Sequence, residues 1–136
     1  MRTDSLSSIY LPLRLVYGLV PIVAGLDKYF NRLVQWDKYL PDSLAAVLPV
    51  DASTFMLLVG GVEIAAGLAV LTLFTRLGAY VVMGWLVLIA LNLVAVGALD
   101  IAVRDLVMAV GAYTLGQVAA LRHEGWVPAK ILAHEV

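Results

Sequence analysis

The stretch Leu77–Leu99 reads LGAYVVMGWLVLIALNLVAVGAL and contains no charged residue. Its only strongly polar side chain is that of Asn92. A helix needs about 20 mainly apolar residues to cross the hydrocarbon core of a bilayer. The stretch is therefore predicted to be a transmembrane helix.

Similar apolar stretches lie on both sides of it, at about residues 9–30, 53–74 and 101–121. The connections at residues 75–76 and around Asp100 leave room only for tight turns, so the helices that they join must be antiparallel neighbours. The sequence thus predicts an all-α integral membrane protein. We expect an antiparallel four-helix bundle that forms a single domain over residues 1–136.

The composition supports a membrane protein over a soluble one. Of the 136 residues, 62% are hydrophobic and 14% are charged, whereas a soluble domain is about half apolar and about a quarter charged. The net charge of −1 provides no basic surface for a nucleic acid. Membrane lipids are therefore the expected surroundings, and nucleic acid is not an expected partner.

The sequence also excludes several kinds of cofactor site. Cysteine is absent, which rules out disulfides, thiolate metal sites and iron–sulfur clusters. Both histidines, His123 and His134, lie in the C-terminal tail, so no imidazole is available to hold a haem within the membrane. We expect no metal and no covalently bound cofactor.

The connection between the first two spans is the longest. It contains Trp36 and Tyr39, then a candidate N-cap at Asp42, and Pro49 as a helix stop. This pattern predicts a short interfacial helix that lies on the bilayer surface. A plain extramembrane loop is the alternative.

The distribution of basic residues bears on orientation. If both termini lie on one side, that side holds five basic residues and the other side four. We therefore expect both termini in the cytoplasm. The five are Arg2, Arg14, Arg76, Arg122 and Lys130, and the four are Lys28, Arg32, Lys38 and Arg104.

Glu63 is the only charge in the second span, and an ionised carboxylate there costs roughly 2.5 to 3.5 kcal/mol. Gly60 and Gly67 share its helix face, which predicts that the face packs against a neighbouring helix. Arg14 lies on a matching stripe of the first span, together with Lys28. We expect Arg14 and Glu63 to pair inside the bundle, either as a ligand site or as a purely structural pin between helices.

A second polar group is expected at the opposite membrane face. Asp100 and Arg104 are spaced as an i, i+4 pair, and a solvated interfacial network is the favoured interpretation. Within the spans, Asn92 and Gln117 are candidates for hydrogen bonds between helices. The full second group is Asp27, Lys28, Asp100, Arg104 and Asp105.

Four segments in this order resemble the DoxX family over about residues 9–121. They are Leu13-Arg-Leu-Val-Tyr-Gly18, Gly25-Leu-Asp-Lys28, Gly61-Val-Glu-Ile-Ala-Ala-Gly67 and Arg104-Asp-Leu-Val-Met-Ala109. The resemblance implies a four-helix protein of the bacterial inner membrane. It also implies that Arg14 and Glu63 are the first candidates to carry any family function, and that Lys28 and Arg104 are the second. Some relatives are subunits of a thiosulfate:quinone oxidoreductase, but without cysteine this chain offers no thiol persulfide.

The leading functional hypothesis is a small membrane subunit of a larger redox assembly that binds a lipophilic partner such as a quinone. We expect it not to be catalytic alone, because its electrons would come from another subunit. A purely structural accessory subunit and a small oligomeric transporter are the alternatives. The predicted ligand-binding residues are Arg14, Lys28, Glu63, Asn92 and Arg104.

Overall fold

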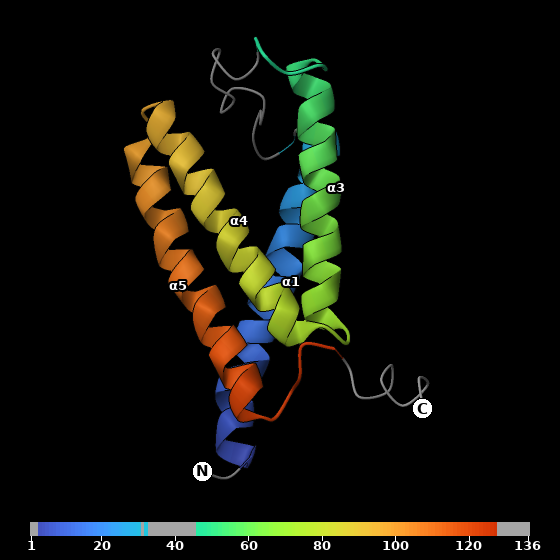
Figure 1. The fold of residues 1–136 in the computed structure, drawn as a ribbon, viewed down its shortest axis with the longest axis vertical. Coiled ribbons are helices and arrows are strands. Elements are labelled where there is room, and N and C mark those ends of the chain that lie inside the picture. Colours follow the sequence, from blue (N-terminus) through green and yellow to red (C-terminus); the bar gives the residue numbers. More distant parts are fainter. Residues whose placement is uncertain (1–2, 31, 33–45, 128–136) are drawn as a thin grey trace.

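The computed structural model describes residues 3–30, 32 and 46–127. This part of the chain is helical and contains α1 (Thr3–Phe30), α3 (Ala52–Leu71), α4 (Thr75–Ala95) and α5 (Leu99–Leu121) (Figure 1). Each of the four is long and apolar enough to cross a membrane. The predicted all-α, four-span fold is therefore confirmed. The first half of the predicted interfacial helix, up to residue 45, lies outside the described residues, and its second half, residues 46–49, forms a turn and not a helix.

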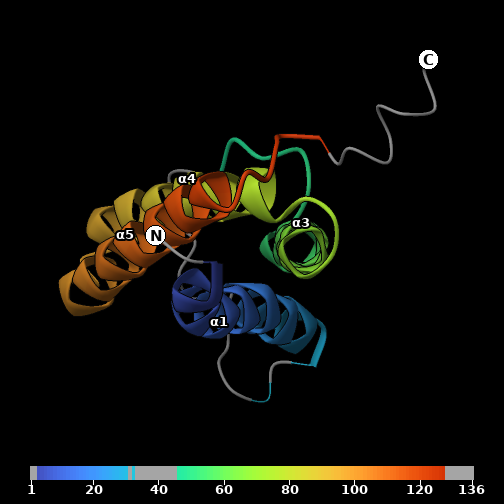
Figure 2. The same cartoon turned by 90° about the horizontal axis from the view of Figure 1, so that it is seen from below.

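The helices form two antiparallel pairs, α1 with α3 and α4 with α5. The pairs meet near the α3–α4 turn and diverge toward the opposite end, and the view along the bundle shows them as separate layers (Figures 1 and 2). The start of α1 and the end of α5 lie at the same end of the bundle, as four spans require. The side of the membrane on which that end lies stays a prediction.

Glycines bring α1 and α3 into close backbone contact. A Cβ atom on Gly25 would lie 2.5 Å from the carbonyl oxygen of Gly60, and one on Gly60 would lie 2.7 Å from the oxygen of Gly25. A Cβ on Gly67 would likewise collide with the oxygen of Gly18. Because only hydrogen fits at these positions, the two helices approach each other as small-residue faces do in membranes.

The helix ends have local causes. Asp51 caps α3 by accepting the backbone N–H of Thr54 at 2.9 Å, and hydrogen bonds from the Thr54 hydroxyl and N–H lower the pKa of Asp51. Gly97, with a φ of 82°, ends α4: its N–H bonds to Val94 and that of Ala98 bonds to Leu93, which is a Schellman motif. The third span thus ends before the predicted Leu99.

The C-terminus of α5 repeats this motif with a less suitable residue. The N–H groups of His123 and Glu124 bond to the carbonyls of Ala120 and Ala119, and His123 has a φ of 63°. A left-handed conformation costs a residue with a Cβ atom about 1 kcal/mol or more. His123→Gly should therefore stabilise the protein by about 1 kcal/mol in detergent unfolding titrations.

Gly97→Ala is the reciprocal control for this prediction. A Cβ on Gly97 would meet no atom within 4 Å, so the alanine would suffer only from the positive φ. We expect a loss of about 1 kcal/mol. Equal stabilities of the wild type and His123→Gly would show that the His123 backbone carries no such cost.

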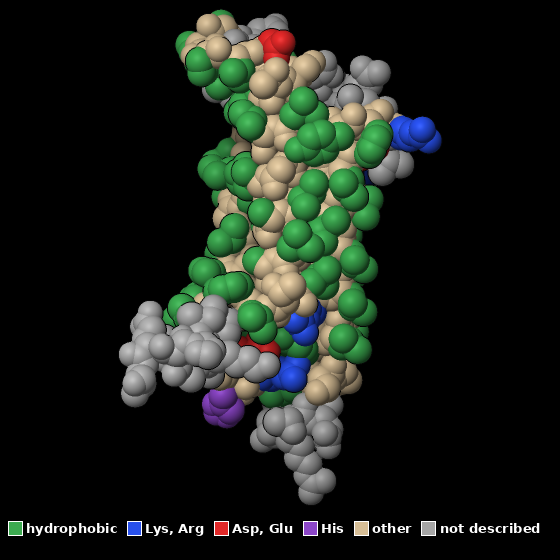
Figure 3. Space-filling view, turned by 90° about the vertical axis from the view of Figure 1, so that its right-hand side faces the viewer, with side chains coloured by type: hydrophobic (Ala, Val, Ile, Leu, Met, Phe, Trp, Pro, Cys, Tyr) green, Lys and Arg blue, Asp and Glu red, His purple; other side chains and the backbone are tan. Residues whose placement is uncertain are grey.

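The outer surface of the bundle is apolar. Large hydrophobic side chains are exposed along all four helices, and they cover the face seen in Figure 3 between charged groups near its ends. The buried core is small and is built around Val70, Ala79, Ala112 and Leu115. Lipid or another membrane protein must cover such a surface.

Candidate functional site

A buried ion pair joins α1 to α3. Lys28 Nζ lies 2.7 Å from Glu63 Oε2, and the side chains are only 4% and 7% exposed. Side chains on a helix lean toward its N-terminus. Because α1 and α3 are antiparallel, Lys28 and Glu63 lean toward each other and meet between the two helices.

This pair lies deep in the predicted membrane region. At about 1.5 Å per residue, Glu63 is roughly 16 Å along α3 from Ala52 and roughly 12 Å from Leu71. Lys28 belongs to the last turn of α1, and its side chain extends from there to the carboxylate. A charge at this depth is expensive unless it is paired, and the contact supplies each charge with its partner.

A third side chain reaches the carboxylate from the other helix pair. Trp85 on α4 donates its indole N–H to Glu63 Oε1 at 3.3 Å. This hydrogen bond is longer than the usual 2.7 to 3.2 Å range and is therefore weak. It nevertheless makes Glu63 the point at which α1, α3 and α4 are joined by polar contacts. We call Lys28, Glu63 and Trp85 the buried polar centre.

Two further buried acids lie toward the end of the bundle where α1 ends and α5 begins. Asp105 on α5 is 8% exposed, and its carboxylate interacts electrostatically with Glu63 and Arg104. Asp27 is also buried and accepts the backbone N–H of Arg32 at 3.1 Å. Glu63 thus has a second carboxylate, that of Asp105, within electrostatic range.

The predicted pair between Arg14 and Glu63 is wrong. Arg14 instead donates to the last carbonyls of α3 and the turn beyond it: Nε to Val70 at 3.0 Å, and Nη2 to Leu71 at 2.7 Å and Thr72 at 2.6 Å. These carbonyls have no partner within the helix. The guanidinium therefore caps α3, which ends at Leu71 and not at the predicted residue 74.

The register between α1 and α3 explains the error. Gly18 faces Gly67 and Gly25 faces Gly60, so Arg14 lies level with the end of α3. Gly18 and Gly25 on α1 are seven residues apart, and so are Gly60 and Gly67 on α3. If these glycines are matched between two antiparallel helices, Glu63 is predicted to lie near the C-terminal end of α1. This spacing was the available signal in the sequence.

The other predicted residues have separate positions. Lys28 is part of the buried polar centre and not of a solvated network, whereas Asp100 and Arg104 are exposed on α5. Asn92 is half-buried on α4, two turns beyond Trp85. Gln117 donates from α5 to the Tyr80 hydroxyl on α4 at 2.6 Å, which confirms its interhelical hydrogen bond.

The part played by Trp85 was missed at the level of sequence. Its position within the apolar third span predicts a packing residue. The available signal was its depth, because tryptophan is enriched at membrane–water interfaces and Trp85 is at the middle of α4. An indole N–H buried in a span needs an acceptor, and Glu63 is that acceptor.

Comparisons with known proteins give one result. The DoxX family model matches residues 9–97, which include most of α1, all of α3 and α4, and the whole buried polar centre. Comparisons with curated proteins and with solved structures found no match.

Proposed function

Because the chain belongs to the DoxX family, we propose that it is a small membrane subunit of a redox assembly in the bacterial inner membrane and binds a quinone at the buried polar centre. The observation that carries the proposal is the Lys28–Glu63 ion pair, buried between α1 and α3 and contacted by Trp85. Ionisable groups within a membrane commonly mark ligand or proton pathways.

The centre offers the hydrogen-bond donors that a quinone needs. Quinone carbonyl oxygens accept hydrogen bonds, and the Lys28 ammonium and the Trp85 indole N–H are donors at the junction of three helices. The Trp85 bond is the longer of the two, so it is the first to exchange for a ligand oxygen. The surrounding apolar helices accommodate an isoprenoid tail.

The centre also contains groups that transfer protons. Reduction of a quinone to a quinol takes up two electrons and two protons. In this proposal Glu63 takes up protons from the aqueous side near the start of α5, by way of Asp105, which is within electrostatic range of it, and passes two in turn to the quinone carbonyl oxygens. The electrons come from a partner subunit in this proposal, so the isolated chain is expected to have no activity.

The test is binding of a short-chain ubiquinone analogue to the purified protein in detergent, followed by isothermal calorimetry. Wild type should bind saturably. Trp85→Phe should weaken binding by about tenfold, which corresponds to about 1.4 kcal/mol, because it removes a hydrogen-bond donor to the quinone oxygen.

Trp126→Phe is the matched control, because Trp126 lies beyond α5 at the other end and stacks on Arg76. Its affinity should equal that of wild type. Absence of saturable binding to wild type, or equal binding by all variants, would contradict the quinone site.

A structural accessory subunit is the second candidate. It is favoured by the closure of Lys28 on Glu63 at 2.7 Å, because this contact compensates each charge and ties α1 to α3 without any ligand. In that case a larger membrane complex should co-purify in mild detergent with wild type and with Trp85→Phe alike, and no quinone should bind.

A further inference from the structure

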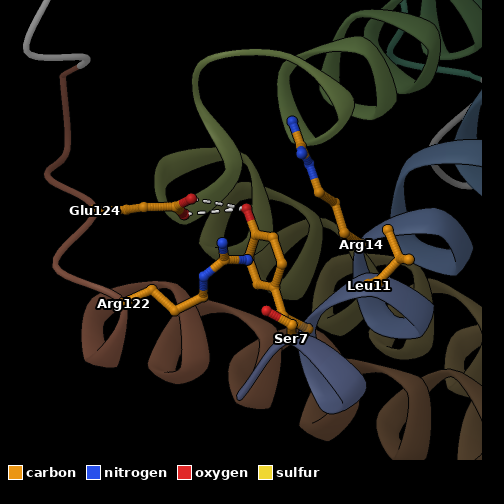
Figure 4. Close-up of a pocket in the computed structure, with 6 residues that line it drawn as sticks. Ser7, Leu11, Arg14, Arg122 and Glu124 are labelled. Atoms are coloured by element: carbon orange, nitrogen blue, oxygen red, sulfur yellow. Dashed lines mark hydrogen bonds between the residues drawn. The ribbon is translucent and has the colours of Figure 1, made fainter. Parts of the chain in front are cut away.

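A cavity lined mainly by polar and charged residues opens at the end of the bundle where α1 begins and α5 ends, far from the buried polar centre. We propose that it binds the phosphate group of an anionic membrane lipid. Its volume is about 320 Å³, and its lining residues are Ser7, Tyr10, Leu11, Arg14, Arg122 and Glu124 (Figure 4).

Arg122 is the principal ligand in this proposal. Its guanidinium lies over the Tyr10 ring, 3.9 Å from the ring centroid. The guanidinium donates no hydrogen bond to any residue of the described ranges. A planar guanidinium held on an aromatic ring, with its donors available, matches the oxygens of a phosphate group.

The charge balance around the cavity favours an anion. Arg14 is the second cation at the Tyr10 ring, 5.8 Å from its centroid. Glu124 opposes these charges, but its carboxylate accepts the Tyr10 hydroxyl at 2.8 Å. Arg76 adds a further positive charge where its Nη1 donates to the Glu124 carbonyl at 3.3 Å. Among these described side chains, the net charge is therefore positive.

The surface beside the cavity favours a lipid over a free anion. Leu11 lines the cavity and begins an exposed row with Leu15 and Leu19. These residues are spaced by one turn and lead along α1 from the cavity toward the middle of the membrane. A phosphate in the cavity and an acyl chain along this row fit one amphiphile, and Tyr10 and Trp126 mark the interface depth at which lipid phosphates lie.

Native mass spectrometry of the full-length protein tests this inference. The protein is exchanged into micelles with equal amounts of phosphatidylglycerol and phosphatidylcholine, and the bound lipids are counted. Wild type should retain phosphatidylglycerol at least tenfold over phosphatidylcholine. Arg122→Gln should lose most of that preference, and Arg122→Lys should keep part of it, because lysine retains the charge but not the planar donors.

Arg104→Gln is the matched control, since Arg104 is an exposed arginine nearer the other end of α5, and it should behave as wild type. Equal retention of both lipids, or an unchanged preference in Arg122→Gln, would overturn the proposal. A separate arm adds inorganic phosphate. Release of phosphatidylglycerol at millimolar phosphate would identify a free-anion site and overturn the lipid assignment.

Discussion

Lys28→Met should destabilise the protein by about 3 to 5 kcal/mol, the usual consequence of removing one partner from a buried ion pair. The substitution leaves the Glu63 carboxylate at mid-membrane depth with only the long Trp85 hydrogen bond. Methionine keeps the length and apolar stem of lysine, so lost packing contributes little. Reversible unfolding in mixed micelles, with helicity as the signal, measures the difference.

Substitution of the other partner, Glu63→Gln, should reduce stability less than Lys28→Met does. Glu63→Gln still accepts the Trp85 N–H, and Lys28 lies in the last turn of α1, from which a long side chain can turn toward the headgroups. Glu63→Ala should cost more than Glu63→Gln because it also removes the acceptor.

The double variant Lys28→Met/Glu63→Gln separates pairing from packing. It should recover much of the stability that Lys28→Met loses, because it strands no charge. Arg32→Gln, at an exposed cation, is the control and should change stability by about 0.5 kcal/mol or less. A nearly neutral Lys28→Met would mean that the pair contributes no stability.

The fold was accessible from the sequence because a bilayer imposes one strong requirement on length and polarity. The uncharged Leu77–Leu99 stretch already determines a spanning helix, and the structure has α4 there. The helix ends were less accessible. They depend on single interactions, such as the left-handed Gly97 and the Arg14 contacts with the α3 carbonyls, which hydropathy does not detect.

The site was predicted only in part. Helix periodicity correctly placed Gly60, Glu63 and Gly67 on one buried face, but periodicity within a helix says nothing about its register against a neighbour. Arg14 and Lys28 lie on the same stripe of α1, so either was a possible partner for Glu63. The backbone contacts of glycines decided between them, and those are properties of two helices together.

Gly67→Ala tests that decisive contact and should destabilise the protein by roughly 1 to 3 kcal/mol. The new Cβ would collide with the Gly18 carbonyl oxygen and lie 2.6 Å from Ile22 Cγ1. A backbone oxygen cannot move without its helix, so α1 and α3 must separate. Gly67→Leu should prevent folding of the pair, measured as loss of the folded fraction in mild detergent.

Gly84→Ala is the matched control, because it makes the same substitution inside α4 where a Cβ would meet nothing within 4 Å. Its higher helix propensity should leave stability unchanged or raise it by up to about 1 kcal/mol. If the glycine contact also sets the Lys28–Glu63 register, Gly67→Ala and Lys28→Met should be less than additive, since the first already pulls the charges apart. Full additivity would show that the ion pair holds its geometry independently of the glycines.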